Sequence, residues 1–142
     1  MLKEINVMLD HGAKAPERAH NWDAGLDLFM PKNATAYVKP GGHLIVDTGV
    51  HVEIPEGYVG LLKSKSGLNV KRSLTGEGVI DAGYTGSIVV KLYNHGVIPY
   101  KFGPGEKLIQ LLIIKCETPE VKIVESFKET ERGAAGFGST GR

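Results

Sequence analysis

Val50-His-Val-Glu-Ile54 alternates apolar with polar residues, and this alternation decides the fold class of the chain. Successive side chains of a strand point to opposite faces, so the pattern predicts a strand with one wet and one dry face. Residues 44–46 precede this stretch and residues 59–62 follow it, and both are rich in β-branched residues or leucine, as buried strands are. We therefore expect a fold built mainly from β-strands.

Short apolar runs of the same kind recur along most of the chain. Residues 88–93 and 108–114 have the composition of buried strands, whereas residues 2–9 and 121–124 have that of edge or terminal strands. The chain contains 19 glycines and 7 prolines that separate these runs, and only residues 66–73 could form a short helix. Regular spacing of short strands predicts an all-β sandwich or jelly roll.

The bulk properties narrow the class of protein further. A chain of 142 residues is the size of one domain, and its net charge of +1 gives no indication of a nucleic-acid groove or a membrane surface. No apolar stretch reaches membrane-spanning length, and the first residues show no signal peptide. We therefore expect a cytoplasmic protein that binds neither nucleic acid nor membrane. Cys116 is expected to be a buried small hydrophobe, and Trp22 to pack at the entry to a strand.

Arg132-Gly-Ala-Ala-Gly-Phe-Gly-Ser-Thr-Gly-Arg142 combines glycines with groups that suit a nucleotide. Glycine backbone can approach an anion closely, and arginine, serine and threonine side chains donate to phosphate oxygens. Phe137 adds a ring on which a base could stack. We interpret the segment as a flap that closes over a nucleotide, with a frayed glycine-rich tail as the alternative. The composition changes after Phe127, which divides the domain into a core, residues 1–127, and a flexible arm, residues 128–142.

Gly78-Val-Ile-Asp81-Ala-Gly-Tyr84-Thr-Gly86 is the second candidate for chemistry. Val79 and Ile80 are strand-like, so Asp81 falls at a strand end, where a carboxylate can face a cleft. The glycines that follow permit a tight hairpin, and Tyr84 places a flat ring near its tip. An ordinary β-hairpin with aspartate favoured at its turn remains an alternative interpretation.

Three further segments carry weaker signals. Ser64-Lys65-Ser66-Gly67-Leu68 is a possible phosphate clamp or a solvated loop. Ala24-Gly-Leu-Asp27-Leu28 places one carboxylate between leucines, where it could simply be a hydrogen-bonded strand residue. Gly105-Glu-Lys107-Leu-Ile-Gln110 places an amide in an apolar strand, where it needs a ligand or backbone as partner.

These five segments, in this order, resemble the five motifs of the trimeric dUTPase family, and the resemblance runs from Ala24 to Gly141. It implies a distorted jelly-roll subunit and a homotrimer with active sites at the subunit interfaces. It also implies that the C-terminal arm is exchanged between subunits and closes over a neighbour's site. The implied reaction converts dUTP and water to dUMP and diphosphate, with Mg²⁺ on the triphosphate.

The resemblance also assigns roles to individual residues. Asp81 matches the catalytic carboxylate that orients and deprotonates the attacking water, and Tyr84 matches the ring that packs on deoxyribose and leaves no room for a 2′-hydroxyl. Asp27 matches a carboxylate that supports the site and is a candidate contact to the metal's water shell. The backbone that reads uracil is implied at Gly78, Val79 and Ile80. Phosphate contacts are implied for Lys65, Ser66, Gly67 and Gln110. In the arm, the implied contacts are Arg132 to the terminal phosphate, Phe137 stacked on uracil, and the flap donors Gly138, Ser139 and Thr140.

The chain departs from the family pattern at Lys65 and Lys107, where arginine is usual, and at Thr75, where some relatives have asparagine. Two alternative functions remain open. A dCTP deaminase shares the fold but needs an acid where this chain has Lys91. A nucleotide-sensing regulator could use the same site as a switch.

Overall fold

A computed structural model describes residues 1–141, which form eleven strands and one short helix. The prediction of an all-β fold is therefore confirmed. The strands are β1 Val7–Leu9, β2 Leu26–Phe29, β3 Ala36–Val38, β4 His43–Asp47, β5 Val50–Val52, β6 Tyr58–Lys63, β7 Leu74–Thr75, β8 Glu77–Ile80, β9 Val89–Asn94, β10 Tyr100–Phe102 and β11 Lys107–Lys115. The helix is α1 Ser66–Arg72. No helix among these residues has both the length and the apolar character needed to cross a bilayer.

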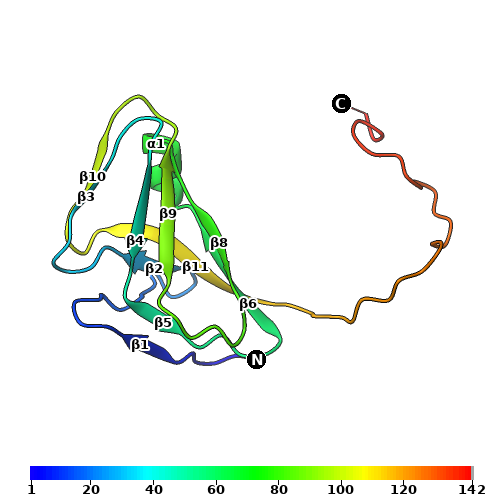
Figure 1. The fold of residues 1–142 in the computed structure, drawn as a ribbon, viewed down its shortest axis with the longest axis horizontal. Coiled ribbons are helices and arrows are strands. Elements are labelled where there is room, and N and C mark those ends of the chain that lie inside the picture. The colour runs from blue at the N-terminus through cyan, green and yellow to red at the C-terminus, as the bar shows by residue number, and fades with distance from the viewer. Residues whose placement is uncertain (142) are drawn as a thin grey trace.

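The strands form four antiparallel sheets around one core (Figure 1). The largest has the order β2-β11-β6-β8, and the next has the order β4-β9-β7. Two ribbons, β1-β5 and β10-β3, complete the body. Because β8 is the last strand of its sheet, one of its edges is not paired with another strand of the described chain.

The core lies between the sheets because their strands alternate in burial. In β9, Val90 and Leu92 are buried, whereas Val89, Lys91 and Tyr93 are exposed. This alternation leaves the outer face of the β4-β9-β7 sheet without a covering layer in one chain. The largest fully buried side chains are Phe29, Phe102, Leu28, Met30, Leu74, Ile88, Leu92, Leu108, Ile109 and Leu111.

The helix predicted for residues 66–73 is present and ends at Arg72. Ser73 adopts a left-handed conformation, with φ of 56°, and donates its N–H to the carbonyl of Asn69, which closes the last turn. Lys71 and Arg72 complement the negative end of the helix dipole. Lys65 precedes the helix, and no side chain caps its first turn.

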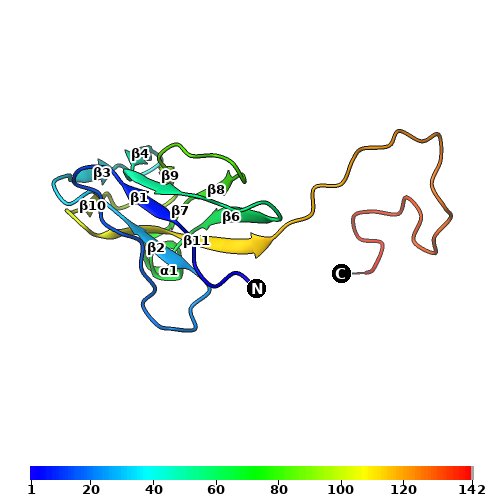
Figure 2. The same ribbon diagram turned by 90° about the horizontal axis from the view of Figure 1, so that it is seen from below.

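After β11 the chain leaves the body as an extended arm (Figures 1 and 2). The strand predicted for residues 121–124 is wrong, because the structure has no strand there, and Val121 and Ile123 are 87% and 89% exposed. Two smaller expectations are also wrong. Trp22 is 98% exposed, and Cys116 is only partly buried because it follows the last two residues of β11, which have already left the core.

Candidate functional site

The loop of residues 81–87 follows β8 and carries the predicted catalytic carboxylate; we call it the Asp81 loop. Ile80 is buried at the end of β8, and Asp81 is exposed immediately after it. The N–H of Tyr84 donates to the Asp81 carbonyl at 3.2 Å, and Gly83 has a φ of +85°, which a residue with a side chain rarely adopts. The tight turn predicted from the glycines is therefore present, and it directs the backbone of Asp81 away from the core.

The ring of Tyr84 is held by two neighbours in the same loop. Its hydroxyl donates to the carbonyl of Ser87 at 2.9 Å. The ring also lies over Gly86, where a Cβ atom would overlap it. Because Gly86 leaves this space free, the ring can keep its contact with Ser87 while Tyr84 stays half-exposed.

A second group of predicted residues surrounds the buried carboxylate of Asp27 on β2. Lys65 donates a hydrogen bond to Asp27 Oδ1, and Lys107 Nζ lies 3.0 Å from Oδ2 as an ion pair. The approach of Lys107 does not have hydrogen-bond geometry, so Oδ2 is buried without a hydrogen bond from the described residues. Two ammonium groups around one carboxylate leave this group with a net positive charge.

Gln110 belongs to the same group, because it pairs with Asp27 across β2 and β11. Its Nε2 donates to the carbonyl of Ser64 at 2.9 Å, directly before the helix. Ser66 and Gly67 form the exposed first turn of α1, which contains no acidic residue. We call these residues the cationic cluster; they are Asp27, Lys65, Ser66, Gly67, Lys107 and Gln110. Uncapped helical N–H groups beside two lysines suit an anionic ligand.

The cationic cluster and the Asp81 loop lie at opposite ends of the β6-β8 pair. Lys63 pairs with Glu77 at the cluster end, whereas Gly60 pairs with Ile80 at the loop end. These ends are three residues apart along the strands, which corresponds to about 10 Å. The helix that carries Ser66 and Gly67 follows β6 at one end, and the Asp81 loop follows β8 at the other. One chain therefore does not bring Asp81 together with Ser66 and Gly67.

The predicted arm residues form a third group, remote from both others (Figure 1). Arg132 Nε donates to the carbonyl of Ala135 at 2.8 Å, and the N–H of Ser139 donates to the carbonyl of Gly136 at 2.9 Å. Phe137, Gly138 and Thr140 are exposed. Arg142, named above as a possible phosphate ligand, lies outside the described residues.

The described residues do not fit a metal ion held by protein ligands alone. No group of three or more histidine, cysteine, aspartate or glutamate side chains converges on one point among residues 1–141. Both carboxylate oxygens of Asp27 face lysine ammonium groups, which would compete with a divalent cation. A metal at this site would therefore have to be carried mainly by its ligand's own oxygens and by water.

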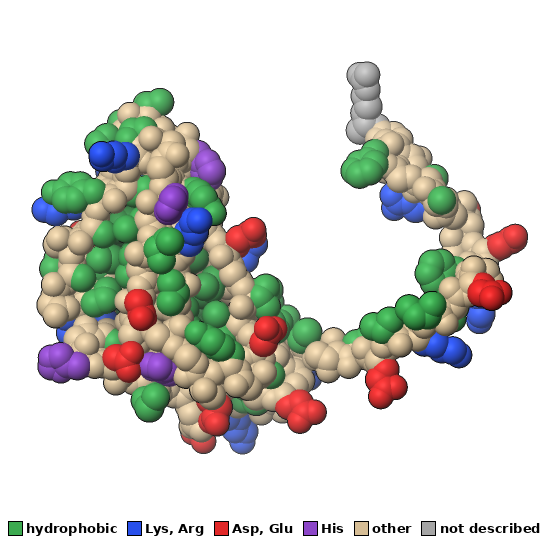
Figure 3. Space-filling model, in the orientation of Figure 1, with side chains coloured by type: hydrophobic (Ala, Val, Ile, Leu, Met, Phe, Trp, Pro, Cys, Tyr) green, Lys and Arg blue, Asp and Glu red, His purple; other side chains and the backbone are tan. Residues whose placement is uncertain are grey.

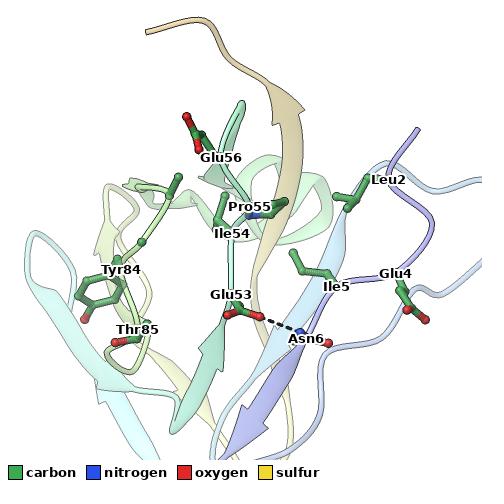
Figure 4. A pocket seen from close by; sticks show the side chains of 12 residues that line it. Leu2, Glu4, Ile5, Asn6, Glu53, Ile54, Pro55, Glu56, Tyr84 and Thr85 are labelled. Carbon is green, nitrogen blue, oxygen red and sulfur yellow. Dashed lines mark hydrogen bonds between the residues drawn. The ribbon is translucent and has the colours of Figure 1, made fainter.

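A cleft of about 750 Å³ lies between the Asp81 loop and the N-terminal segment (Figure 4). Tyr84 and Thr85 line one wall, and the N-terminal segment lines the other. The side chains of Glu4, Glu53 and Glu56 also line the cleft. Three carboxylates disfavour a phosphate, so this cleft differs in chemistry from the cationic cluster.

Sequence reasoning missed two residues that shape these groups. Gly25 leaves space for Gln110, and the only sequence signal was a glycine two residues before Asp27. His51 contacts the Asp81 loop from β5, and its position in an alternating strand indicated only that it faces outward.

Comparison with known proteins assigns the chain to a family. The model of the family described as dUTPase matches residues 11–141. A deoxyuridine 5′-triphosphate nucleotidohydrolase of Clostridium tetani is 37% identical over 138 residues, which are 95% of this chain and 94% of that protein. The enzyme of the same name from Yarrowia lipolytica is 40% identical, over 95% of this chain and 87% of its own.

Solved structures agree with the sequence comparison. The dUTPase of Staphylococcus bacteriophage 80alpha, solved with dUPNHPP, has a TM-score of 0.90 and 36% identity, covering 99% of this chain and 100% of its own. A point mutant of the dUTPase from phage phi11 of S. aureus, described as coordinating a structural Mg(II) ion, has a TM-score of 0.81 and 34% identity, covering 89% of this chain and 100% of its own. The chain therefore belongs to the dUTPase family and has its jelly-roll-like fold.

Proposed function

We propose that this protein is a dUTP diphosphatase, which converts dUTP and water to dUMP and diphosphate. The observation that carries the proposal is the placement of Asp81. Its carboxylate belongs to an exposed residue at the end of β8, in a tight turn beside a fixed tyrosine ring, within a chain that matches the dUTPase family over residues 11–141.

In the proposed reaction Asp81 orients a water molecule and accepts one of its protons. The water oxygen forms a bond to the α-phosphorus while the bond from that phosphorus to the diphosphate oxygen breaks. A positioned general base of this kind contributes about 10²–10⁴-fold to the rate. Tyr84 packs on the deoxyribose, and its fixed ring leaves no room for a 2′-hydroxyl.

The uracil base is assigned to the open edge of β8. Gly78, Val79 and Ile80 lie in a strand whose other edge pairs with β6, so backbone donors and acceptors of the open edge are available in a single chain. A Cβ on Gly78 would be 3.0 Å from Leu62 Cδ1, so glycine allows close packing there. Backbone groups in this fixed order would accept the donor and acceptor pattern of uracil and reject that of cytosine.

The triphosphate is assigned to the cationic cluster. Lys65, Ser66, Gly67 and Gln110 would contact phosphate oxygens, and Arg132 of the arm would contact the terminal phosphate. Mg²⁺ would arrive with the substrate and would neutralise part of the charge on the phosphates beside Lys65 and Gln110. In this arrangement Asp27 supports the two lysines, and any contact with the metal would pass through water.

We further propose a homotrimer in which each site combines the Asp81 loop, the cationic cluster and the arm of different copies. Three observations support this proposal. The three groups lie apart in one chain, and the outer face of the β4-β9-β7 sheet exposes apolar Ile45, Val89 and Tyr93. The arm also exposes apolar side chains along its length (Figure 3). Apolar surfaces of this kind are typical of interfaces.

A nucleotide-sensing regulator is the second candidate. Phage dUTPases among the similar structures are described as controlling transfer of virulence genes by a proto-oncogenic G protein-like mechanism. In this chain the arm is the segment that a bound nucleotide could order. A deaminase is less well supported, because it needs a proton-shuttling carboxylic acid at the position of Lys91, and lysine is a poor candidate for that role. The cytoplasmic location remains a prediction, as does the absence of nucleic-acid and membrane partners.

The test compares release of diphosphate from dUTP, dCTP and UTP, with and without Mg²⁺. We expect strong preference for dUTP, dependence on Mg²⁺, and near-complete loss in Asp81→Asn. Glu120→Gln is the control, because Glu120 is an exposed carboxylate after β11 that belongs to none of the three proposed groups. Tight binding of dUTP without turnover by the unmodified protein would contradict the enzyme and support the regulator.

A further inference from the structure

His51 of β5 joins the Asp81 loop to the segment that follows β1. Its Nδ1 lies 2.7 Å from the carbonyl oxygen of Thr85, and its Nε2 lies 3.0 Å from Asp10 Oδ1. The side chain is only 18% exposed, although both of its partners lie on the surface. Because Thr85 directly follows Tyr84, this contact reaches the part of the loop nearest to the proposed sugar site.

Both partners of His51 are hydrogen-bond acceptors. A carbonyl oxygen and an ionised carboxylate donate no proton, and a neutral imidazole carries only one N–H. Both contacts are therefore hydrogen bonds only when both ring nitrogens are protonated. A neutral ring would place a nitrogen lone pair against an oxygen lone pair at one of these two contacts.

The surroundings favour the protonated ring. The carbonyl of Thr85, followed by the Asp10 carboxylate, raises the pKa of His51 above its ordinary value. Asp47, at the end of β4, is a more distant negative charge that acts in the same direction. Glu53 lines the same surface hollow as His51 and Thr85, and its carboxylate accepts a hydrogen bond from Asn6 Nδ2 at 2.7 Å.

The other hydrogen bonds that attach the Asp81 loop involve residues on either side of Thr85. Ser87 donates its hydroxyl to Asp47 Oδ1, and the N–H of Ile88 donates to the carbonyl of Val50 at 2.8 Å, so the end of the loop is attached to β4 and β5. Tyr84 is held through Ser87. Among the described residues, the only hydrogen-bond contact from Thr85 to another element is the one to His51.

We propose that His51 is a positioning residue that holds the Asp81 loop in its working conformation only while both ring nitrogens carry protons. The inference rests on the proposed function, in which this loop supplies Asp81 and Tyr84. When the ring loses a proton, one of its two hydrogen bonds is lost. Either Thr85 then loses its contact with His51, or His51 loses the contact with Asp10 that holds the ring in place.

The direction of the pH effect follows from the sign of the pKa shift. Because the pKa is raised in the folded chain, the clamp is complete at low pH and is lost as the pH rises through the folded-state pKa. Because the proposed reaction depends on the geometry of this loop, kcat should fall on the alkaline side of the His51 pKa.

The experiment measures kcat and KM for Mg·dUTP against pH, together with the NMR titration of the His51 ring and of the Thr85 and Gly86 amides. In the unmodified protein kcat should fall by about three- to tenfold as pH rises through the His51 midpoint. His51→Gln, which offers one neutral donor, should be slower at low pH and flat across that window. Asp10→Asn keeps the acceptor but removes the charge, so the midpoint should move to lower pH.

His11→Gln is the matched control, because His11 is exposed and should leave the pH profile unchanged. An unchanged kcat profile in His51→Gln would overturn the proposal, and so would loop amides that do not follow the His51 titration. If His51→Gln fails to fold, the displaced midpoint in Asp10→Asn decides the question. If the unmodified protein hydrolyses no dUTP, the proposed function fails, whereas the amide titration still tests the clamp.

Discussion

Gly25 lies directly against the side chain of Gln110. A Cβ built on Gly25 would overlap Gln110 Oε1 and lie 3.0 Å from Gln110 Cδ. The same amide donates to the carbonyl of Ser64 at 2.9 Å, and so links β11 to the segment before α1. Glycine at position 25 is therefore part of what places Gln110 at the cationic cluster.

Gly25→Ala should displace the Gln110 amide and weaken nucleotide binding. We expect a higher KM for dUTP and a loss of about 1–3 kcal/mol in the free energy of unfolding, because the neighbour must move to admit the methyl group. Urea unfolding and steady-state kinetics measure the two effects. Gly136→Ala is the stability control, because nothing lies within 4 Å of a Cβ at that position. Equal stability of the two variants would contradict the packing argument.

Removing Lys65 should destabilise the fold more than removing Lys107. The side chain of Asp27 is 3% exposed, that of Lys65 24% and that of Lys107 46%, and only Lys65 makes a hydrogen bond to the carboxylate. Lys65→Met should lower the free energy of unfolding by about 2–4 kcal/mol, because it leaves a buried charge with one exposed partner. Lys107→Met should cost about 1 kcal/mol or less, because water screens that pair.

A triple variant checks the electrostatic reason for this difference. Adding Asp27→Asn to the Lys65→Met/Lys107→Met double variant removes the unpaired buried charge and should restore part of the lost stability. If the triple variant is less stable than the double, the lysines do not act by compensating Asp27.

Asp47 should contribute its full stabilisation above about pH 4 and lose it as the pH falls further. The hydroxyl of Ser87, followed by the N–H of Gly49, holds the pKa of Asp47 below its ordinary value. A lowered folded-state pKa means that this stability is present above the unfolded pKa and is lost as pH falls through the folded one. The stability difference between the unmodified protein and Asp47→Asn should therefore stay constant from neutral pH down to about pH 5 and shrink as the pH falls below about pH 4.

Ser87→Ala tests the same interaction from the other side. This substitution removes the hydroxyl that contributes most to the lowered pKa of Asp47. The free energy of unfolding should therefore fall less steeply with acid in Ser87→Ala than in the unmodified protein. Urea unfolding at fixed protein concentration measures both variants. A pH dependence that Ser87→Ala leaves unaltered would show that the hydroxyl does not set this pKa.

Deleting residues 132–142 should leave the stability of the body unchanged, because the described residues of that segment form hydrogen bonds only with one another and with Thr130. The trimer should also persist, because in the proposed assembly this segment supplies closure over the site rather than core packing. Turnover of dUTP should fall by about 10²-fold or more, since closure positions the substrate for reaction. Thermal unfolding, sedimentation and dUTP kinetics on the truncated chain measure these outcomes. A truncated protein with the full rate would show that the arm takes no part in the reaction.

The strands are predictable wherever burial sets a pattern in the sequence. Residues 108–114 are expected as a strand, and β11 runs from Lys107 to Lys115, because a central strand needs apolar side chains on both faces. The same kind of signal fails at residues 121–124. An apolar, β-branched pattern shows that a segment could form a strand. It does not show whether the chain provides a neighbouring strand with which the segment can pair.

The candidate site is predictable residue by residue, but its assembly is not. The sequence indicates a carboxylate at Asp27 and a lysine at Lys65, but it does not indicate that they form a pair. The pair forms because β2 pairs with β11 and the start of α1 lies beside it. For His51 the alternation predicts only an outward-facing strand residue. Its contact with Thr85 joins residues 34 apart in the chain and depends on how the Asp81 loop folds back.

A mixing experiment tests the central claim, that the reaction site is shared between copies of this chain. Asp81→Asn and the chain lacking residues 132–142 would each be inactive alone and are unfolded together, refolded and assayed with dUTP. If loop and arm come from different copies, random mixing at equal concentration should restore about a quarter of the unmodified rate. A mixture as inactive as its components would contradict the shared site.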